Sequence, residues 1–139
     1  MSAYHTLKTE YRDRDTLVEA LKEMGYPEVE VHDEATNLYG YHGDKRSQKA
    51  NVIVRRKYVG SAANDLGFVK TEDGTYEAIV SEYDSSTHCT PTFFKGLQRN
   101  YAEKGAIKAA AKKGFKYLGK TIGKNGKPQL RWMDTRVNA

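Results

Sequence analysis

Residues 65–84, DLGFVKTEDGTYEAIVSEYD, contain the pattern that most restricts what this chain can fold into. Asp73-Gly74 is a strong signal for a tight β-turn. Leu66 and Phe68 before the turn, and Tyr76, Ala78 and Val80 after it, stand at every second position, so each set lies on one face of a strand. The segment therefore predicts a β-hairpin in an antiparallel sheet, and nothing in it requires a catalytic role.

Residues 13–27 predict the clearest helix of the sequence. Apolar residues recur at helical spacing from Leu17 onward, which places them on one face. We expect Asp15 or Thr16 to cap the first turn. Gly25 is expected to end the helix in a left-handed conformation, because glycine adopts it without steric cost.

Further strands are predicted wherever β-favouring residues lie between turn signals. We expect them at residues 2–11, 28–32, 37–43 and 50–58, and in a last hairpin made of residues 115–123 and 128–133. A second helix is predicted from Pro91, with an apolar stripe that ends at Tyr101. Lysines continue this stripe beyond Tyr101, so we expect a kink or break near Gly105.

Strands joined by tight turns favour antiparallel pairing. The sequence predicts a single α+β domain over residues 1–139, with an antiparallel sheet of about six to eight short strands, one N-terminal helix and a kinked or two-part C-terminal helix. The single cysteine, Cys89, cannot form an internal disulfide, and no apolar run approaches the roughly 20 residues that cross a bilayer. The N-terminus has no apolar signal region. We expect no membrane association and a cytoplasmic or equivalent reducing compartment.

Charge is distributed unevenly along the chain. Residues 1–89 have 11 Lys and Arg against 16 Asp and Glu, whereas residues 90–139 have 12 against 2. This asymmetry predicts a surface for nucleic acid or an acidic protein, and it equally fits a solvated lysine coat that neutralises the acidic part. The residues expected to engage the acidic partner are Lys95, Arg99, Lys104, Lys108, Lys112, Lys113, Lys116 and Lys120. Their lysine-rich composition favours diffuse attraction over the reading of bases.

Aromatic residues offer a second candidate interface. Stacking on nucleic-acid bases is predicted for Tyr39, Tyr41, Phe68 and Tyr76, which also fit as half-buried strand residues. The segment 39–46 places aromatic and basic residues around two glycines, as a phosphate-binding loop does. It matches neither the Walker lysine motif nor the dinucleotide-binding fingerprint.

The sequence offers little for catalysis. His88 and Cys89 are neighbours, but adjacent side chains in an extended loop point apart, whereas a catalytic pair must meet. The other histidines lack the spacing of metal ligands. We expect no metal, no cofactor and no small-molecule ligand. An enzyme is the third interpretation, and a deep polar cleft around His42, Asp44 and Lys45, or around His88 and Cys89, would favour it.

Four segments together resemble a known family. They are AYHTLKTEYRDRDTLVEALKEMGY, GYHGDKR, DLGFVKTEDGTYEAIVSEYD and FKGLQRNYAEKGAIKAAAKKGF. They are similar to the hypothetical chloroplast reading frames of algal plastids, cyanobacteria, other bacteria and some phages, an uncharacterised family with a domain of unknown function. The resemblance covers nearly the whole chain and includes the strand Gln129–Trp132. The chain differs in the inserted segments DKRSQ and YVGSAAND and in its lysine-rich last third.

The resemblance implies no catalytic residues. Genes of the family often lie beside ATPases of the AAA type, which implies an accessory role, and the reducing compartment would include a plastid stroma or an infected host cytoplasm. We expect a non-enzymatic binding module that engages nucleic acid or an acidic protein through its lysine-rich C-terminal helical surface. The alternative is an adaptor or structural subunit of a larger assembly, with an AAA-type ATPase as one candidate partner.

Overall fold

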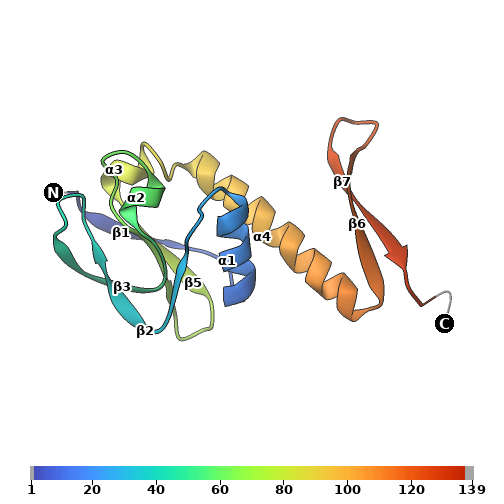
Figure 1. The fold of residues 1–139 in the computed structure, drawn as a ribbon, viewed down its shortest axis with the longest axis horizontal. Helices are drawn as coiled ribbons and strands as arrows, with labels where there is room; N and C mark the ends of the chain where they lie inside the picture. The colour runs from blue at the N-terminus through green and yellow to red at the C-terminus, as the bar shows by residue number, and fades with distance from the viewer. Residues whose placement is uncertain (1, 137–139) are drawn as a thin grey trace. The chain divides into compact units, whose positions relative to one another are not determined.

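Seven strands and four helices make up residues 2–136, the part of the chain that this computed structural model describes. In chain order they are β1 (Tyr4–Lys8), α1 (Arg14–Glu23), β2 (Glu30–Tyr39), β3 (Lys45–Val54), α2 (Arg56–Val59), β4 (Leu66–Lys70), β5 (Tyr76–Ser81), α3 (Glu82–Ser85), α4 (Pro91–Lys112), β6 (Phe115–Ile122) and β7 (Pro128–Asp134) (Figure 1). The fold is α+β with two antiparallel sheets, which confirms the predicted class.

Internal contacts divide the chain into two units, Met1–Tyr101 (unit 1) and Ala102–Ala139 (unit 2), with the boundary inside α4. Unit 1 contains a five-stranded sheet in the order β1-β5-β4-β3-β2, and unit 2 contains the two-stranded sheet β6-β7. The single domain predicted over residues 1–139 stays a prediction.

The predicted hairpin of residues 65–84 is confirmed as β4 and β5, which lie side by side within the five-stranded sheet. Its turn is fixed by Asp73, whose carboxylate accepts a hydrogen bond from the backbone N–H of Thr75 over 3.0 Å. Gly74 has a φ of 87°, a left-handed conformation that glycine adopts at no steric cost. The hairpin therefore supplies two inner strands of the sheet.

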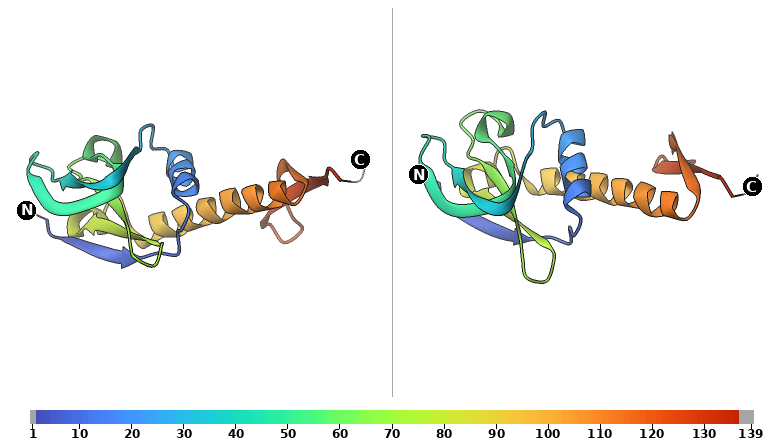
Figure 2. Two further views of the ribbon diagram at one scale, coloured as in Figure 1. Left: turned by 90° about the horizontal axis from the view of Figure 1, so that it is seen from below. Right: turned by 60° about the horizontal axis from the view of Figure 1, so that its bottom comes forward.

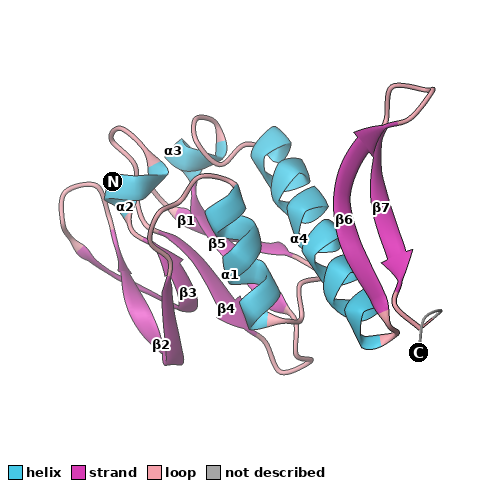
Figure 3. Ribbon diagram, turned by 45° about the vertical axis from the view of Figure 1, so that its right-hand side comes forward, coloured by secondary structure: helices cyan, strands magenta, loops and turns pink. Residues whose placement is uncertain are grey.

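Helix α1 and the first half of α4 cover one face of the five-stranded sheet (Figure 3). Leu17 and Leu21 of α1 and Leu97 of α4 are completely buried, and they share a core with Phe68 of β4. Burying an apolar side chain of this size contributes about 1.5–3 kcal/mol, so this face supplies most of the cohesion of unit 1.

The start of α1 differs from the prediction. Its N-cap is Asp13, whose carboxylate accepts a hydrogen bond from the backbone N–H of Thr16 over 3.1 Å, so the predicted cap at Asp15 or Thr16 is wrong. Asp13 takes this place because it directly precedes the helix, where its side chain satisfies an N–H that has no intrahelical acceptor. The predicted stop is confirmed, since Gly25 has a φ of 108°.

The opposite face of the sheet holds a smaller core made of Leu38, Ala50, Ile53 and Ile79. Strands β2 and β3 form a long, curved pair over this side (Figure 2). The two strands predicted at residues 28–32 and 37–43 are parts of one strand, β2, which covers only Glu30–Tyr39 and whose pairing with β3 shifts register twice. Such irregularities bend a strand, which is why the sequence pattern looks interrupted there.

One continuous helix, α4, replaces the predicted two-part helix, so of the two alternatives near Gly105 the break is wrong and the kink stays a prediction. Glycine inside a helix costs only about 1 kcal/mol relative to alanine. Lys104 and Lys108, which continue the apolar stripe, are half-buried. Long lysine side chains can lay their aliphatic stems along a surface, so they need no change of helix direction. Pro91 is the first helical residue, as predicted.

Unit 2 consists of the last turns of α4 and the hairpin of β6 and β7, as the sequence predicts. The hairpin turn is closed by the backbone N–H of Gly123, which donates to the carbonyl of Lys127 over 2.9 Å. Tyr117 and Trp132 lie opposite each other on the two strands, with ring centroids 5.4 Å apart. No residue between 102 and 136 is fully buried.

Candidate functional site

The eight basic residues predicted to engage an acidic partner lie on α4, on the turn after it and on β6. Lys95 and Arg99 are exposed on the part of α4 that belongs to unit 1. The members in unit 2 are Lys104, Lys108 and Lys112 on α4, Lys113 in the turn, and Lys116 and Lys120 on β6. Five of the eight residues are therefore helical, and the other three are not.

Unit 2 concentrates positive charge. Residues 102–136 contain ten Lys and Arg against two acidic residues. Both acids form ion pairs inside the unit, Glu103 with Lys120 at 2.6 Å and Asp134 with Arg136 at 2.9 Å. The hydrogen bond from Arg136 lowers the pKa of Asp134 to about 2, so this pair stays ionised at neutral pH. Within the unit, cations therefore outnumber carboxylates by eight.

One side of the hairpin combines cations with exposed apolar side chains. Lys116 on β6 lies opposite Met133 on β7, and partners directly opposite each other share a face. Met133 is 44% exposed, and Leu118, at the register shift of β6, is 46% exposed. Arg131, also exposed, lies opposite Gly119. This composition suits a partner that offers negative charge together with flat or apolar groups.

The four aromatic candidates do not form one face. Tyr39 and Tyr41 are 38% and 47% exposed, whereas Phe68 and Tyr76 are 0% and 4% exposed. Phe68 and Tyr76 belong to the core under the helices, so they cannot stack on an external base, and their prediction as stacking residues is wrong. Alternation along a strand shows that residues share a face, but it does not show whether a helix covers that face.

Cys89 and His88 do not form a catalytic pair. Cys89 is buried, and this burial, together with nearby Asp84, raises the pKa of its thiol to about 12. The ring nitrogen Nε2 of His88 lies 2.8 Å from the carbonyl oxygen of Ser61 instead. A thiol that stays protonated at neutral pH is a poor nucleophile, so Cys89 acts here as a small core residue.

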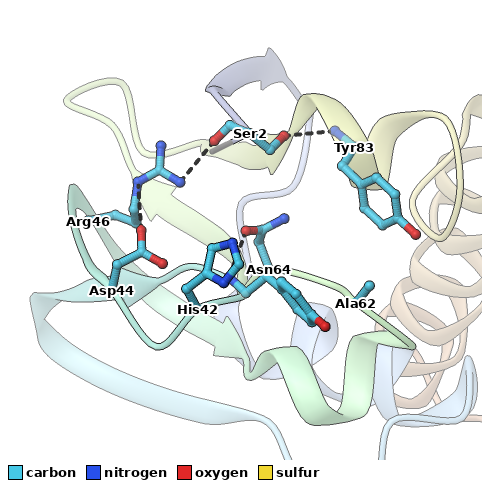
Figure 4. Close-up of a pocket in the computed structure, with 8 residues that line it drawn as sticks. Ser2, His42, Asp44, Arg46, Ala62, Asn64 and Tyr83 are labelled. Carbon is cyan, nitrogen blue, oxygen red and sulfur yellow. Dashed lines mark hydrogen bonds and ion pairs between the residues drawn. The ribbon is translucent and has the colours of Figure 1, made fainter.

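A pocket of about 230 Å³ opens in unit 1 where four chain segments meet (Figure 4). Its lining comes from the residues before β1, the turn between β2 and β3, the loop before β4, and α3. The lining residues are Ser2, Tyr41, His42, Asp44, Arg46, Ala62, Asn64 and Tyr83. A deep polar cleft around His42, Asp44 and Lys45 was the condition that would favour an enzyme, and the pocket includes the first two residues but not Lys45.

Asp44 is the unusual member of this lining. Both of its carboxylate oxygens are shielded from solvent, and neither accepts a hydrogen bond from the described residues. The nearest cation is Arg46, whose Nε lies 3.9 Å from Oδ2, beyond hydrogen-bond range. The carboxylate lies against Gly40, where a Cβ atom would come within 2.6 Å of Oδ1. Glycine at position 40 therefore permits this placement.

A buried polar network holds the pocket wall in place. The side-chain oxygen of Asn64 accepts a hydrogen bond from the backbone N–H of Tyr41 over 2.9 Å. Its side-chain amide donates to Ser81 Oγ over 3.0 Å, and its backbone N–H donates to Asp84 Oδ2 over 2.9 Å. Asn64 and Asp84 are 4% and 1% exposed, so water cannot replace these bonds. The network fixes Tyr41 relative to the loop before β4.

Two further features hold the other walls. Ala62 has a φ of 56°, a left-handed conformation that is uncommon for a residue with a Cβ atom. The backbone N–H of Tyr83 donates to Ser2 Oγ over 2.9 Å, and Arg46 Nη1 donates to the carbonyl of Ser2 over 2.9 Å. Ser2 therefore links α3 to β3 across the pocket (Figure 4).

Sequence reasoning singled out the segment 39–46 but missed the other pocket residues, Ser2, Ala62, Asn64 and Tyr83. They come from three segments that are distant in the chain, and no motif joins them. The loop YVGSAAND, noted as a departure from the family pattern, contains two of them. For Ala62 and Asn64, this unusual insertion was the one sequence signal that could have pointed to the site.

Within residues 2–136, no group of three or more His, Cys, Asp and Glu is arranged to hold a metal ion. Nor does any helix in this part of the chain have the length and apolar character needed to cross a membrane.

A family model described as "Protein of unknown function (DUF1257)" matches residues 20–130. The chain belongs to this family. The matched range includes the hairpin of β4 and β5, every lining residue of the pocket except Ser2, and most of unit 2. No curated protein and no solved structure matches the chain.

Proposed function

We propose that this protein is a non-enzymatic binding module whose unit 2 holds the phosphate backbone of a nucleic acid. The observation that carries the proposal is the charge of residues 102–136. This segment contains ten cationic side chains and only two carboxylates, both of which form ion pairs within unit 2. Cations that neutralise phosphates release condensed counterions, and this term supplies nearly all of the affinity in sequence-independent binding.

The arrangement of the cations supports a row of phosphate contacts. Lys104, Lys108 and Lys112 recur every four residues on α4, which spaces them about 6 Å apart along the helix axis. Lys116 and Arg131 add charge from β6 and β7. Nine of the twelve basic residues from 90 to 139 are lysines, and lysine provides a point charge rather than the planar fork that reads guanine. The proposed binding is therefore insensitive to sequence.

A salt titration with a matched pair of variants tests this proposal. The full-length chain would be titrated with fluorescein-labelled single-stranded and duplex oligonucleotides from 50 to 200 mM salt, with anisotropy as the measurement. The test variant is Lys112→Gln, Lys113→Gln and Lys116→Gln together, three exposed residues of α4, its end and β6. The control variant removes the same charge from unit 1 at Lys22, Lys49 and Lys70, which are also exposed.

If all three test lysines contact phosphates, the slope of log K against log salt for duplex DNA should become shallower by about 2.7. The control variant should keep the slope of the unmodified chain. Equal losses in both variants, or an affinity no greater than that for an uncharged polymer, would remove nucleic acid as the partner. Binding to polyglutamate but to no oligonucleotide would point to an acidic protein instead.

A second candidate function is that of an adaptor or structural subunit in a larger assembly. It is favoured by the absence of any fully buried side chain between 102 and 136 and by exposed apolar residues on the hairpin, Ile122 at 67% above all. A lone two-stranded hairpin is marginally stable, and a partner that covers it would stabilise it. Light scattering and native co-purification would separate this function from nucleic-acid binding.

Finer assignments belong to the same proposal. We place the chain among the hypothetical chloroplast reading frames of plastids, bacteria and phages, on the four segments that resemble them, with an AAA-type ATPase as the protein partner to test first. A cytoplasmic or equivalent reducing compartment fits the single buried Cys89. Binding rather than catalysis is supported by the raised pKa of the Cys89 thiol, which argues against a cysteine nucleophile.

A further inference from the structure

The pocket of unit 1 carries an inference that is independent of the basic unit. We propose that it binds a planar group with two adjacent N–H donors. These N–H groups donate hydrogen bonds to the carboxylate of Asp44, beside the rings of Tyr41 and Tyr83. Guanine and a guanidinium group both present this donor pair. The site uses residues of unit 1 only, so it can be tested without the lysines of unit 2.

The unsatisfied carboxylate is the first argument. An ionised carboxylate accepts up to four hydrogen bonds, whereas Asp44 accepts none from the described residues on either oxygen. A buried polar group without a partner costs about 1–3 kcal/mol, and more when it is charged. In Figure 4 one oxygen of Asp44, Oδ2, is directed at Arg46, and the other, Oδ1, lies against Gly40. A donor supplied by a ligand would remove this cost.

The turn that carries Asp44 is held by its backbone and not by the carboxylate. It is flanked by Gly40 and contains Gly43, whose φ is 76°. The backbone N–H of Gly40 donates to the carbonyl of Asp44 over 2.9 Å, and this bond holds the two ends of the turn together. The side chain can therefore move without breaking the turn.

The aromatic and strained residues around the carboxylate are the second argument. Tyr41 and Tyr83 are 47% and 41% exposed although they line a pocket, so part of each residue is accessible to a flat ligand. Base–aromatic stacking contributes about 1–3 kcal/mol per base. The left-handed backbone of Ala62 adds support, because conformations of this kind are found preferentially at functional sites.

Ligand selectivity follows from the carboxylate. Guanine offers two neighbouring N–H groups on its Watson–Crick edge, and a carboxylate can accept both. Adenine and cytosine place a ring-nitrogen acceptor next to their amino group, and uracil has one N–H between two carbonyls, so each would set an acceptor against the carboxylate. Arg46 offsets the charge of Asp44 from 3.9 Å, which allows a neutral base as well as a cation.

Calorimetric titration of the full-length chain with unphosphorylated probes tests the proposal. Guanosine is compared with adenosine, and methylguanidine with methylamine, because these pairs differ in the donor pair but carry no phosphate for the lysines. The test variant is Asp44→Asn, which replaces one acceptor oxygen by an amide. The matched control is Asp33→Asn, on the same strand pair and with a side chain 96% exposed. Far-UV circular dichroism confirms that both variants are folded.

We expect guanosine or methylguanidine to bind, and the Asp44→Asn variant to lose about 10- to 100-fold in affinity while Asp33→Asn keeps it. Binding of guanosine that also weakens in a Tyr41→Leu variant identifies a base as the source, and binding of methylguanidine alone identifies a guanidinium group. The proposal is overturned if adenosine binds as tightly as guanosine or if the Asp44→Asn variant binds with unchanged affinity. It is also overturned if neither guanosine nor methylguanidine binds at about 5 mM, a concentration that would detect a binding free energy of only about 3 kcal/mol.

Discussion

Replacing Asp65 by asparagine should destabilise unit 1 far more than the loss of one surface charge would. Asp65 is 1% exposed, immediately before β4. One carboxylate oxygen accepts hydrogen bonds from the backbone N–H of Tyr39 at 2.7 Å and from Arg55 Nη1 at 2.8 Å. The other accepts from the backbone N–H of Arg56 at 2.7 Å. One side chain thereby joins the end of β2, the start of α2 and the loop before β4.

The size of the effect follows from these three bonds. Asparagine keeps one acceptor oxygen but turns an amide donor toward N–H groups on the other side, so at least one buried donor loses its partner. Removing one member of a buried, hydrogen-bonded ion pair costs about 3–5 kcal/mol. Since domains of this kind are stable by about 5–15 kcal/mol, Asp65→Asn should remove a large fraction of that stability. The midpoint of thermal unfolding should fall by about 10–20 °C.

Urea unfolding followed by circular dichroism measures the loss directly. Asp33→Asn is the control, because its exposed side chain should contribute no more than about 0.5 kcal/mol. If Arg55 is the principal partner, the double variant Arg55→Met with Asp65→Asn should be more stable than the sum of the single losses predicts, by about 1–3 kcal/mol. A loss below about 1 kcal/mol in Asp65→Asn would refute the reasoning, since three short bonds to a buried carboxylate would then contribute almost nothing.

Three further predictions concern two glycines and the buried cysteine. Gly67→Ala should lower the free energy of unfolding by about 1–3 kcal/mol, because the added Cβ would meet the Cβ of Ala50 at 2.7 Å. In Gly105→Ala the added Cβ meets no described atom within 4 Å, so the free energy of unfolding should stay unchanged or rise by about 0.5–1 kcal/mol. Equal urea midpoints for the two variants would contradict this. Cys89 should not react with a thiol reagent at pH 8 until the chain is unfolded, because burial raises the pKa of its thiol to about 12 from 9.0; rapid labelling of the native chain would contradict this. Since the unfolded chain loses this proton first, the contribution of Cys89 to stability is complete below pH 9 and should decline as the pH rises toward 12, a decline that Cys89→Ala should reduce.

Local elements could be read from the sequence where a turn signal and a periodic pattern agreed. The hairpin of β4 and β5 was predicted because Asp73-Gly74 interrupts two alternating runs, and α1 was predicted because its apolar spacing ends at Gly25. The break near Gly105 was wrong because a residue pattern does not show what a helix packs against. A lysine in an apolar stripe predicts a bend only if that stripe must be buried along its whole length.

For the candidate sites too, local properties could be predicted from the sequence and long-range packing could not. The basic character of the last fifty residues is a property of composition, so it was visible without a structure. Phe68 and Tyr76 were misjudged as stacking residues, because burial depends on which face the helices cover. Asn64 and Tyr83 could not be assigned to a pocket at all, since they come from different segments.

The sequence by itself determined the α+β class, most of the hairpins and helices, and the concentration of positive charge near the C-terminal end. These properties depend on neighbours in the chain and on counts of residue types. Only the tertiary structure decided that Asp44 lies in a pocket with no hydrogen-bond partner for its carboxylate among residues 2–136, and that Asp65 joins three segments. Long-range packing brings such side chains together, and the free energy of a buried carboxylate depends on the partners that packing supplies or withholds.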